Sequence, residues 1–102
     1  MYAVVNHFHF NIPVDKIKEH FLKKGLDIIS SFPGFYKFYF IKEDEEQATV
    51  IIIWEDENSA QNTSDSLRAT WFSQYIRPYL IGNRNTRAGE VVIDYPLNPD
   101  DI

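Results

Sequence analysis

Apolar side chains change their spacing along the chain, and each change marks the end of one predicted element. Residues 2–10 read YAVVNHFHF, a stretch rich in Val and Phe that predicts a strand. After "NIP", apolar residues recur at helical spacing from Val14 to about Ser31, which predicts a helix. Pro13 suits the first turn of this helix, because its missing N–H would have no partner there. Gly25 falls inside the period, but the pattern resumes beyond it, so we expect the helix to continue.

Two more strands are expected beyond the turn "FPG". Residues 35–42 read FYKFYFIK, with aromatic side chains at both alternating sets of positions. Residues 48–55 read ATVIIIWE, whose β-branched content makes it the strongest strand prediction in the chain. The acidic stretch at residues 43–47 lies between them and is typical of an exposed turn.

A second helix follows the third strand. Asn58 can cap it, and Gln61, three residues on, can reach back to complete a capping box. Residues 62–66 are rich in side chains that compete for backbone hydrogen bonds, so they interrupt the helix or restart it. We expect the helix to end at Pro78.

The resulting order of elements predicts the fold. The stretch RAGEVVIDY, residues 87–95, is the expected last strand. The order β-α-β-β-α-β predicts an α+β, ferredoxin-like fold, with a four-stranded antiparallel sheet and both helices on one face. The 102 residues fit one domain, which we place over residues 1–95, with residues 96–102 as a polar C-terminal tail.

The second face of this sheet is unusually apolar. In the first strand both alternating sets are largely apolar, Ala3 and Val5 on one side and Val4 and Phe8 on the other. A half-exposed antiparallel sheet normally alternates apolar with polar residues, and monomers rarely leave a large apolar patch bare. We therefore expect a homodimer in which a second copy covers this sheet face about a two-fold axis, with Phe38 in the interface.

Composition and charge narrow the classes of partner. The 16% aromatic content indicates a packed interface or an aromatic-lined pocket. The net charge of −5, with acids gathered in two short runs, disfavours nucleic acid and anionic membrane surfaces as partners. The chain has no cysteine, which excludes disulfides and thiolate chemistry. No signal-peptide pattern opens the chain, and the longest apolar run, Val50–Trp54, is too short to span a bilayer, so we expect a soluble, cytoplasmic protein.

Five short segments together resemble one known family. The segments are VVNHF (residues 4–8), PGF (33–35), IIIWEDENSA (51–60), RPYL (77–80) and GEVVI (89–93). In this order and spacing they resemble the antibiotic-biosynthesis-monooxygenase-like family of the dimeric α+β barrel superfamily. The resemblance covers nearly all of residues 1–95 and implies that two sheets pack together as a dimeric barrel.

The resemblance also implies a range of activities. The family includes cofactor-independent monooxygenases that act on quinol-like aromatics, haem-degrading enzymes and members without an assigned activity. Its first-strand asparagine matches Asn6. In the haem-degrading branch this asparagine works with a Trp and a haem-ligating His on the second helix. The corresponding positions here fall near Thr63 and Ser73, which cannot do this, so haem binding and degradation are disfavoured.

Four residues are the candidates for a site between the helices and the sheet. Asn6 shares its strand face with Phe8; it would orient a substrate oxygen or, alternatively, bond a backbone group at a helix end. Trp71 and Tyr75 lie four residues apart on the second helix, where they form a pocket wall or continue the core. We predict catalytic roles for Asn6 and Tyr75, whose buried phenol would relay a proton, and substrate-binding roles for Phe8 and Trp71.

The remaining polar residues suggest no metal or cofactor. His7 and His9 point to the opposite sheet face, and no third ligand stands at diagnostic spacing. His20 lies on the first helix between Ile17 and Phe21, where we expect a residue at the boundary of the core rather than a base. No triad, phosphate loop or carboxylate pair is present, and no side chain is placed as a general base.

These observations favour a small monooxygenase that acts without a cofactor on an electron-rich, quinol-like aromatic. The alternative is a non-catalytic protein on the same scaffold that binds a small hydrophobic or aromatic ligand or an interaction partner. A filled core and an aromatic pocket have the same composition, so the sequence leaves both open.

Overall fold

A computed structural model describes residues 1–62, 66–83 and 85–96. Its single sheet contains four strands in the order β2-β3-β1-β4, and every neighbouring pair is antiparallel. The strands are β1 (Tyr2–His9), β2 (Phe35–Lys42), β3 (Gln47–Trp54) and β4 (Asn85–Glu90). The α+β, ferredoxin-like prediction is therefore confirmed.

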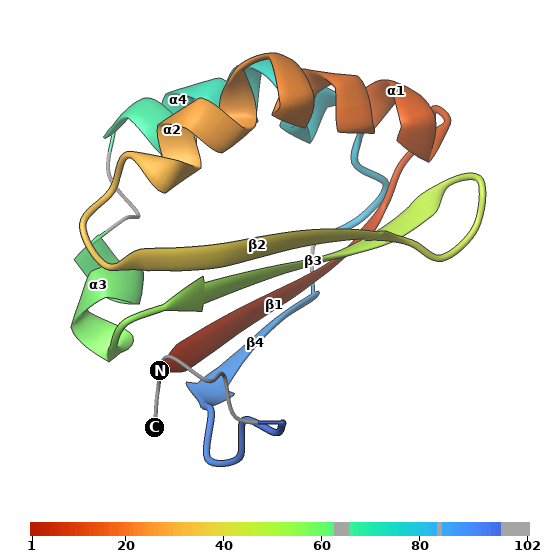
Figure 1. Ribbon diagram of the computed structural model, residues 1–102. Coiled ribbons are helices and arrows are strands. Elements are labelled where there is room, and N and C mark those ends of the chain that lie inside the picture. The colour runs from red at the N-terminus through yellow and green to blue at the C-terminus, as the bar shows by residue number, and fades with distance from the viewer. Residues whose placement is uncertain (63–65, 84, 97–102) are drawn as a thin grey trace.

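The longer helices cover one face of the sheet (Figure 1). The first helical segment comprises α1 (Val14–His20), a π-helical turn η1 (Phe21–Gly25) and α2 (Leu26–Ser30), and it agrees with the predicted helix. Gly25 is needed there, because a Cβ at this position would lie 2.5 Å from Cη2 of Trp71. None of the helices in the described part of the chain is long and apolar enough to cross a membrane.

The second helical region is α3 (Glu57–Asn62), α4 (Ser66–Tyr75) and a 3₁₀ turn η2 (Arg77–Tyr79). The predicted cap at Asn58 is wrong. Asp56 caps α3 instead, because its Oδ1 accepts the backbone N–H of Ser59 at 2.7 Å. The predicted interruption agrees with the end of α3 and the start of α4, while residues 63–65 lie outside the described residues.

The last strand differs from its predicted range. It begins with Asn85 opposite His7 and ends with Glu90 opposite Tyr2, rather than spanning residues 87–95. The physical reason is that β1 begins at Tyr2, and beyond that residue one backbone hydrogen bond, from Val91 N–H to the Met1 carbonyl at 2.8 Å, is the last contact recorded between the two segments in the described chain. The large side chains beyond β4 are consequently bare, with Val92, Ile93 and Tyr95 exposed by 82%, 81% and 86%.

A bulge in β2 changes which face of the sheet its later side chains point to, compared with the prediction. Phe35 pairs with Trp54 and Lys37 with Ile53, so Tyr36 is an extra residue in the ladder. This bulge puts Phe38 on the helix side, with its ring 5.4 Å from that of Phe21. The predicted place of Phe38 in the open sheet face is therefore wrong.

The core lies between the helices and the sheet. Alternate residues of β3 are buried there, as the period of a strand requires. These residues are Ala48, Val50, Ile52 and Trp54. From the helix side, Val14, Ile17 and Ile29 pack on them. Helices α1, α2 and α4 all lie on this side of the sheet, and no helix of the described chain covers its opposite face (Figure 1).

Candidate functional site

A cavity of about 560 Å³ remains open between the helices and the sheet. This volume lies within the range of small-molecule pockets. Strands β1, β2 and β3 form one wall, while η1, α2 and α4 form the other. The lining residues are Asn6, Phe8, Phe21, Ile29, Phe38, Val50, Ile52, Trp71, Phe72, Ser73, Arg77, Leu80, Gly82 and Asn83.

Asn6 is the polar group in the interior of this cavity. It sits in β1 between Val50 of β3 and Thr86 of β4, and it is only 8% exposed. Its Oδ1 accepts the Thr86 hydroxyl at 2.6 Å, whereas its Nδ2 donates to none of the described residues. Because Nδ2 has no acceptor among the described residues, the amide N–H groups of Asn6 are available to a ligand.

The predicted location of Asn6 on the helix side is confirmed. The alternative partner, a backbone group at a helix end, is not the one observed, since a side-chain hydroxyl of β4 takes that place. A catalytic role for Asn6 stays a prediction at this point.

Phe8 and Trp71 form apolar parts of the lining, at the positions expected for pocket walls. Trp71 is 5% exposed and meets Phe21 edge-to-face, with ring centroids 5.0 Å apart. Phe8 packs between Phe10 and Phe72, at centroid distances of 5.7 and 5.8 Å. This aromatic packing holds both walls in one arrangement.

Tyr75 lies outside the cavity, and the predicted burial of its phenol is wrong. The residue is 38% exposed and does not line the cavity. One helical turn beyond Trp71, its ring lies against His20 instead, at a centroid distance of 5.6 Å. Helical spacing alone could not distinguish a position over the sheet from one beside α1.

The mouth of the cavity is polar. Ser73, Arg77, Gly82 and Asn83 are all exposed there. Arg77 is the only charged residue in the described lining. Sequence reasoning did not assign it to a site, because a cation before Pro78 at a helix end also suits an ordinary surface position.

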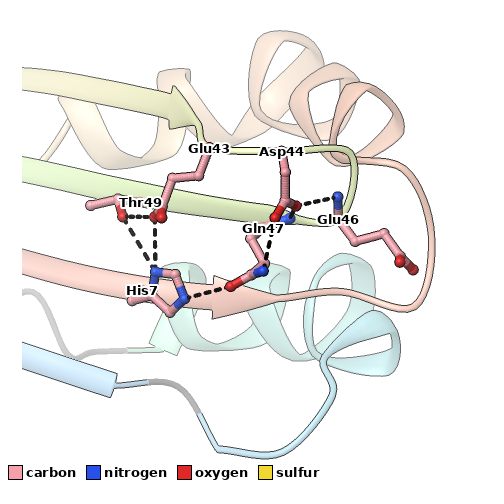
Figure 2. Close-up of polar contacts among 6 residues, drawn as sticks. All are labelled: His7, Glu43, Asp44, Glu46, Gln47 and Thr49. Atoms are coloured by element: carbon pink, nitrogen blue, oxygen red, sulfur yellow. Dashed lines mark hydrogen bonds and ion pairs between the residues drawn. The ribbon is translucent and has the colours of Figure 1, made fainter.

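His7 and His9 lie on the face away from the cavity, as predicted. Figure 2 shows His7 between Glu43, Thr49 and Gln47. Its Nδ1 lies 2.9 Å from Oε1 of Glu43, and its Nε2 lies 3.2 Å from Oε1 of Gln47. Across residues 1–62, 66–83 and 85–96, no three potential ligands are grouped around a metal position.

Hydrogen bonding holds the pKa of the Glu43 carboxyl below its usual value. The Thr49 hydroxyl is the main cause, and His7 contributes further. Glu43 is therefore ionised at neutral pH and acts as an acceptor within the His7 cluster.

The described lining contains no residue suited to ligate haem iron. It includes no His, Cys, Met or Tyr. Of the two positions singled out by the family resemblance, Ser73 lies at the mouth, and Thr63 falls outside the described residues. The residues present therefore do not fit a ligated haem.

Solved structures with the same arrangement include several oxygenases. SnoaB, a cofactor-independent oxygenase from Streptomyces nogalater, aligns over 94% of this chain and 97% of its own, with TM-score 0.79 and 12% identity. A monooxygenase from the gene ActVA-Orf6 of Streptomyces coelicolor, in complex with nanaomycin D, aligns over 91% and 92%, with TM-score 0.69 and 18% identity.

A third similar structure binds porphyrin. It is a variant of MhuD with two manganese protoporphyrin IX molecules per active site, aligned over 92% of this chain and 97% of its own, with TM-score 0.71 and 18% identity. No protein-family model and no curated protein sequence matches the chain. The structural likeness is extensive, and it establishes that the chain has the fold of the antibiotic-biosynthesis-monooxygenase-like proteins.

Proposed function

We propose that this chain is a small oxygenase that acts, without metal or flavin, on an electron-rich, quinol-like aromatic. The observation that carries the proposal is the cavity of about 560 Å³, whose apolar interior contains one buried amide with N–H groups that bond none of the described residues. The cofactor-independent oxygenase SnoaB, which shares the fold, supports the same class of reaction.

The chemistry requires little from the protein. A deprotonated aromatic gives one electron to O2, and the two radicals combine into a peroxide at the ring carbon. Protonation and loss of water then leave a carbonyl, so that a ring methylene and O2 become a ring carbonyl and water. The protein supplies a cavity that excludes water and a donor to the oxygen on which negative charge develops. Asn6 Nδ2 is that donor.

The absence of a proton acceptor from the described lining favours a second candidate. A protein that only binds an aromatic ligand needs the same cavity and no base. The two functions differ in one measurable property, the consumption of O2.

An oxygen electrode separates the two candidates. With an anthrone as the probe, the oxygenase consumes O2 and forms the anthraquinone, and Asn6→Ala lowers this rate by about 100-fold, as expected for a lost oxyanion donor. The matched control is Asn11→Ala, an exposed asparagine outside the cavity lining. Saturable binding without O2 uptake above the uncatalysed rate identifies the binding protein instead.

We also propose that a second copy covers the open face of the sheet. Tyr39, Ile51 and Val5 form one row across this face, and Ile53 and Ala3 belong to the next. Tyr39 is 42% exposed, and Ile41 beside it is equally exposed. Burying such a face removes apolar surface from water, which stabilises association.

The bare segment after β4 supports the same assembly. Val92, Ile93 and Tyr95 are the most exposed large apolar side chains in the described chain. They follow directly on an edge strand, where a neighbouring copy could cover them. The homodimer thus accounts for both the apolar sheet face and this segment.

A further inference from the structure

The charge of the cavity lining is opposite to that of the chain. The chain carries a net charge of −5, yet the described lining contains one arginine and no carboxylate. The Arg77 guanidinium forms no ion pair with any described acidic residue. A cation at the entrance of an apolar cavity attracts an anionic ligand, because the low-dielectric walls focus its field.

Two polar residues of the lining, Asn6 and Arg77, offer hydrogen-bond donors to a ligand. The N–H groups of Asn6 donate to none of the described residues and are available to a ligand, while its Oδ1 already accepts one hydrogen bond, from Thr86. Arg77 has N–H donors and no acceptor. A ligand that matches both groups carries at least two oxygens that accept hydrogen bonds, one in the interior and one at the mouth.

We propose that the site takes aromatic ligands as anions, and that Arg77 is the residue that recognises the negative charge. The ring system occupies the apolar interior, one ring oxygen accepts from Asn6, and an ionised carboxylate or phenolate oxygen lies against Arg77. The inference rests on the proposed function for the identity of the ring system. It names Arg77 as a specificity-determining residue.

For a ligand whose negative charge is a phenolate, the same assignment explains how the reaction proceeds without a base in the described lining. A quinol-like aromatic with an acidic hydroxyl loses its proton to solvent before it binds. The guanidinium then favours the ionised form over the neutral one inside the cavity. The substrate arrives as the electron donor, and no protein group must accept its proton.

The test compares two ligands of the same ring shape and different charge. The probes are anthraquinone-2-carboxylate and its neutral carboxamide, which undergo no turnover. Binding is followed by quenching of tryptophan fluorescence, because Trp71 lines the cavity. We expect the carboxylate to bind about three- to tenfold more tightly than the carboxamide, as for a partly exposed charge-assisted hydrogen bond.

Variants assign this preference to one residue. Arg77→Gln abolishes the preference because it weakens binding of the carboxylate more than binding of the carboxamide, while Arg77→Lys retains part of the preference. The matched control is Arg87→Gln, which removes the same charge from β4 opposite Val5, outside the cavity lining. Equal binding of the two probes, no binding of either, or a preference that survives Arg77→Gln overturns the proposal.

The outcome is separate from that of the oxygenase test. A charge preference without O2 uptake from an anthrone refutes the oxygenase and supports the role of Arg77. O2 uptake without a charge preference supports the oxygenase and refutes the role of Arg77.

Discussion

The Thr86 hydroxyl donates to Asn6 Oδ1 at 2.6 Å, across the ladder between β1 and β4. This contact joins residues 80 positions apart and fixes which side of the amide faces the cavity. Thr86 is itself outside the cavity lining, so it acts on a ligand only through Asn6. It is a positioning residue.

Replacing Thr86 by Val removes this hydroxyl at nearly constant volume. Asn6 Oδ1 then lacks a donor, which lowers the free energy of unfolding by about 1 kcal/mol and lets the amide rotate. Under the proposed function, we expect kcat to fall about tenfold with little change in KM, measured by O2 uptake with an anthrone. Thr86→Ser restores kcat because it restores the hydroxyl. A Val variant with wild-type kcat would contradict the positioning role.

The position of the Asn6 amide on β1 could be predicted from the sequence, whereas its hydrogen-bond partner Thr86 on β4 could not. Alternation along Tyr2–His9 determines which side chains share a strand face, so Asn6 and Phe8 follow from the sequence. The Asn6–Thr86 contact depends on the register between two strands far apart in the chain. Nothing local in the sequence encodes that register.

The errors in the sequence prediction have similar causes. A bulge at Tyr36 reverses the side-chain alternation of β2 and has no local signature, so Phe38 was assigned to the wrong face. The end of β4 is set by where β1 begins, since Tyr2 is its last partner. Tyr75 lies beside His20 and outside the cavity lining, a placement that helical spacing cannot reveal.

The indole of Trp71 lies where a side chain at position 25 would be, so only glycine fits there. Alanine normally favours a helix over glycine by about 1 kcal/mol. Here the added Cβ would lie 2.5 Å from Cη2 of Trp71 and 2.6 Å from its Cζ2, so the buried indole must move. Because such overpacking costs about 1–3 kcal/mol, we expect Gly25→Ala to lower the free energy of unfolding in urea.

A matched control and a second-site variant test this explanation. A Cβ at Gly89 meets no atom within 4 Å, so Gly89→Ala leaves the stability nearly unchanged. Trp71→Phe removes the ring atoms that clash, so the double variant with Gly25→Ala loses less stability than the two single losses combined. If the stability losses of the two single variants add in full, the loss caused by Gly25→Ala comes from the backbone and not from contact with Trp71.

A substitution of Ile51 tests the proposed homodimer directly. Ile51 lies in β3 between Val5 and Tyr39, near the middle of the open sheet face. Ile51→Glu places like charges opposite each other across a two-fold interface, with little cost in the single chain. We expect the wild type to sediment as a dimer and this variant as a monomer at the same concentration.

Leu22→Glu is the control for this substitution. Leu22 is 63% exposed in η1, on the helix side of the molecule. This variant keeps the dimer if the sheet face is the interface. A monomeric wild type, or a dimer that survives Ile51→Glu, would refute the proposed assembly.

The stability of the turn between β2 and β3 depends on pH through the carboxyl group of Asp44. Its Oδ1 accepts the backbone N–H groups of Glu46 and Gln47 at 2.9 and 2.8 Å. The hydrogen bond from Glu46 is the main cause that lowers the pKa of the Asp44 carboxyl, and that from Gln47 adds to it. A pKa lower in the folded than in the unfolded chain stabilises the fold above the unfolded value, and the effect is lost as pH falls through the folded value.

Asp44→Asn removes the charge and keeps the Oδ1 acceptor. We expect this variant to be less stable than the wild type at about pH 7. The difference shrinks as pH falls below about 4, the value of an unfolded aspartate, and is lost once pH has passed through the lower pKa of the folded carboxyl. Midpoints of urea unfolding across this range measure the difference. Glu46→Gln is the control, because the Glu46 side chain extends away from the cluster (Figure 2). A constant difference between Asp44→Asn and the wild type at every pH would show that the charge of Asp44 does not stabilise the turn.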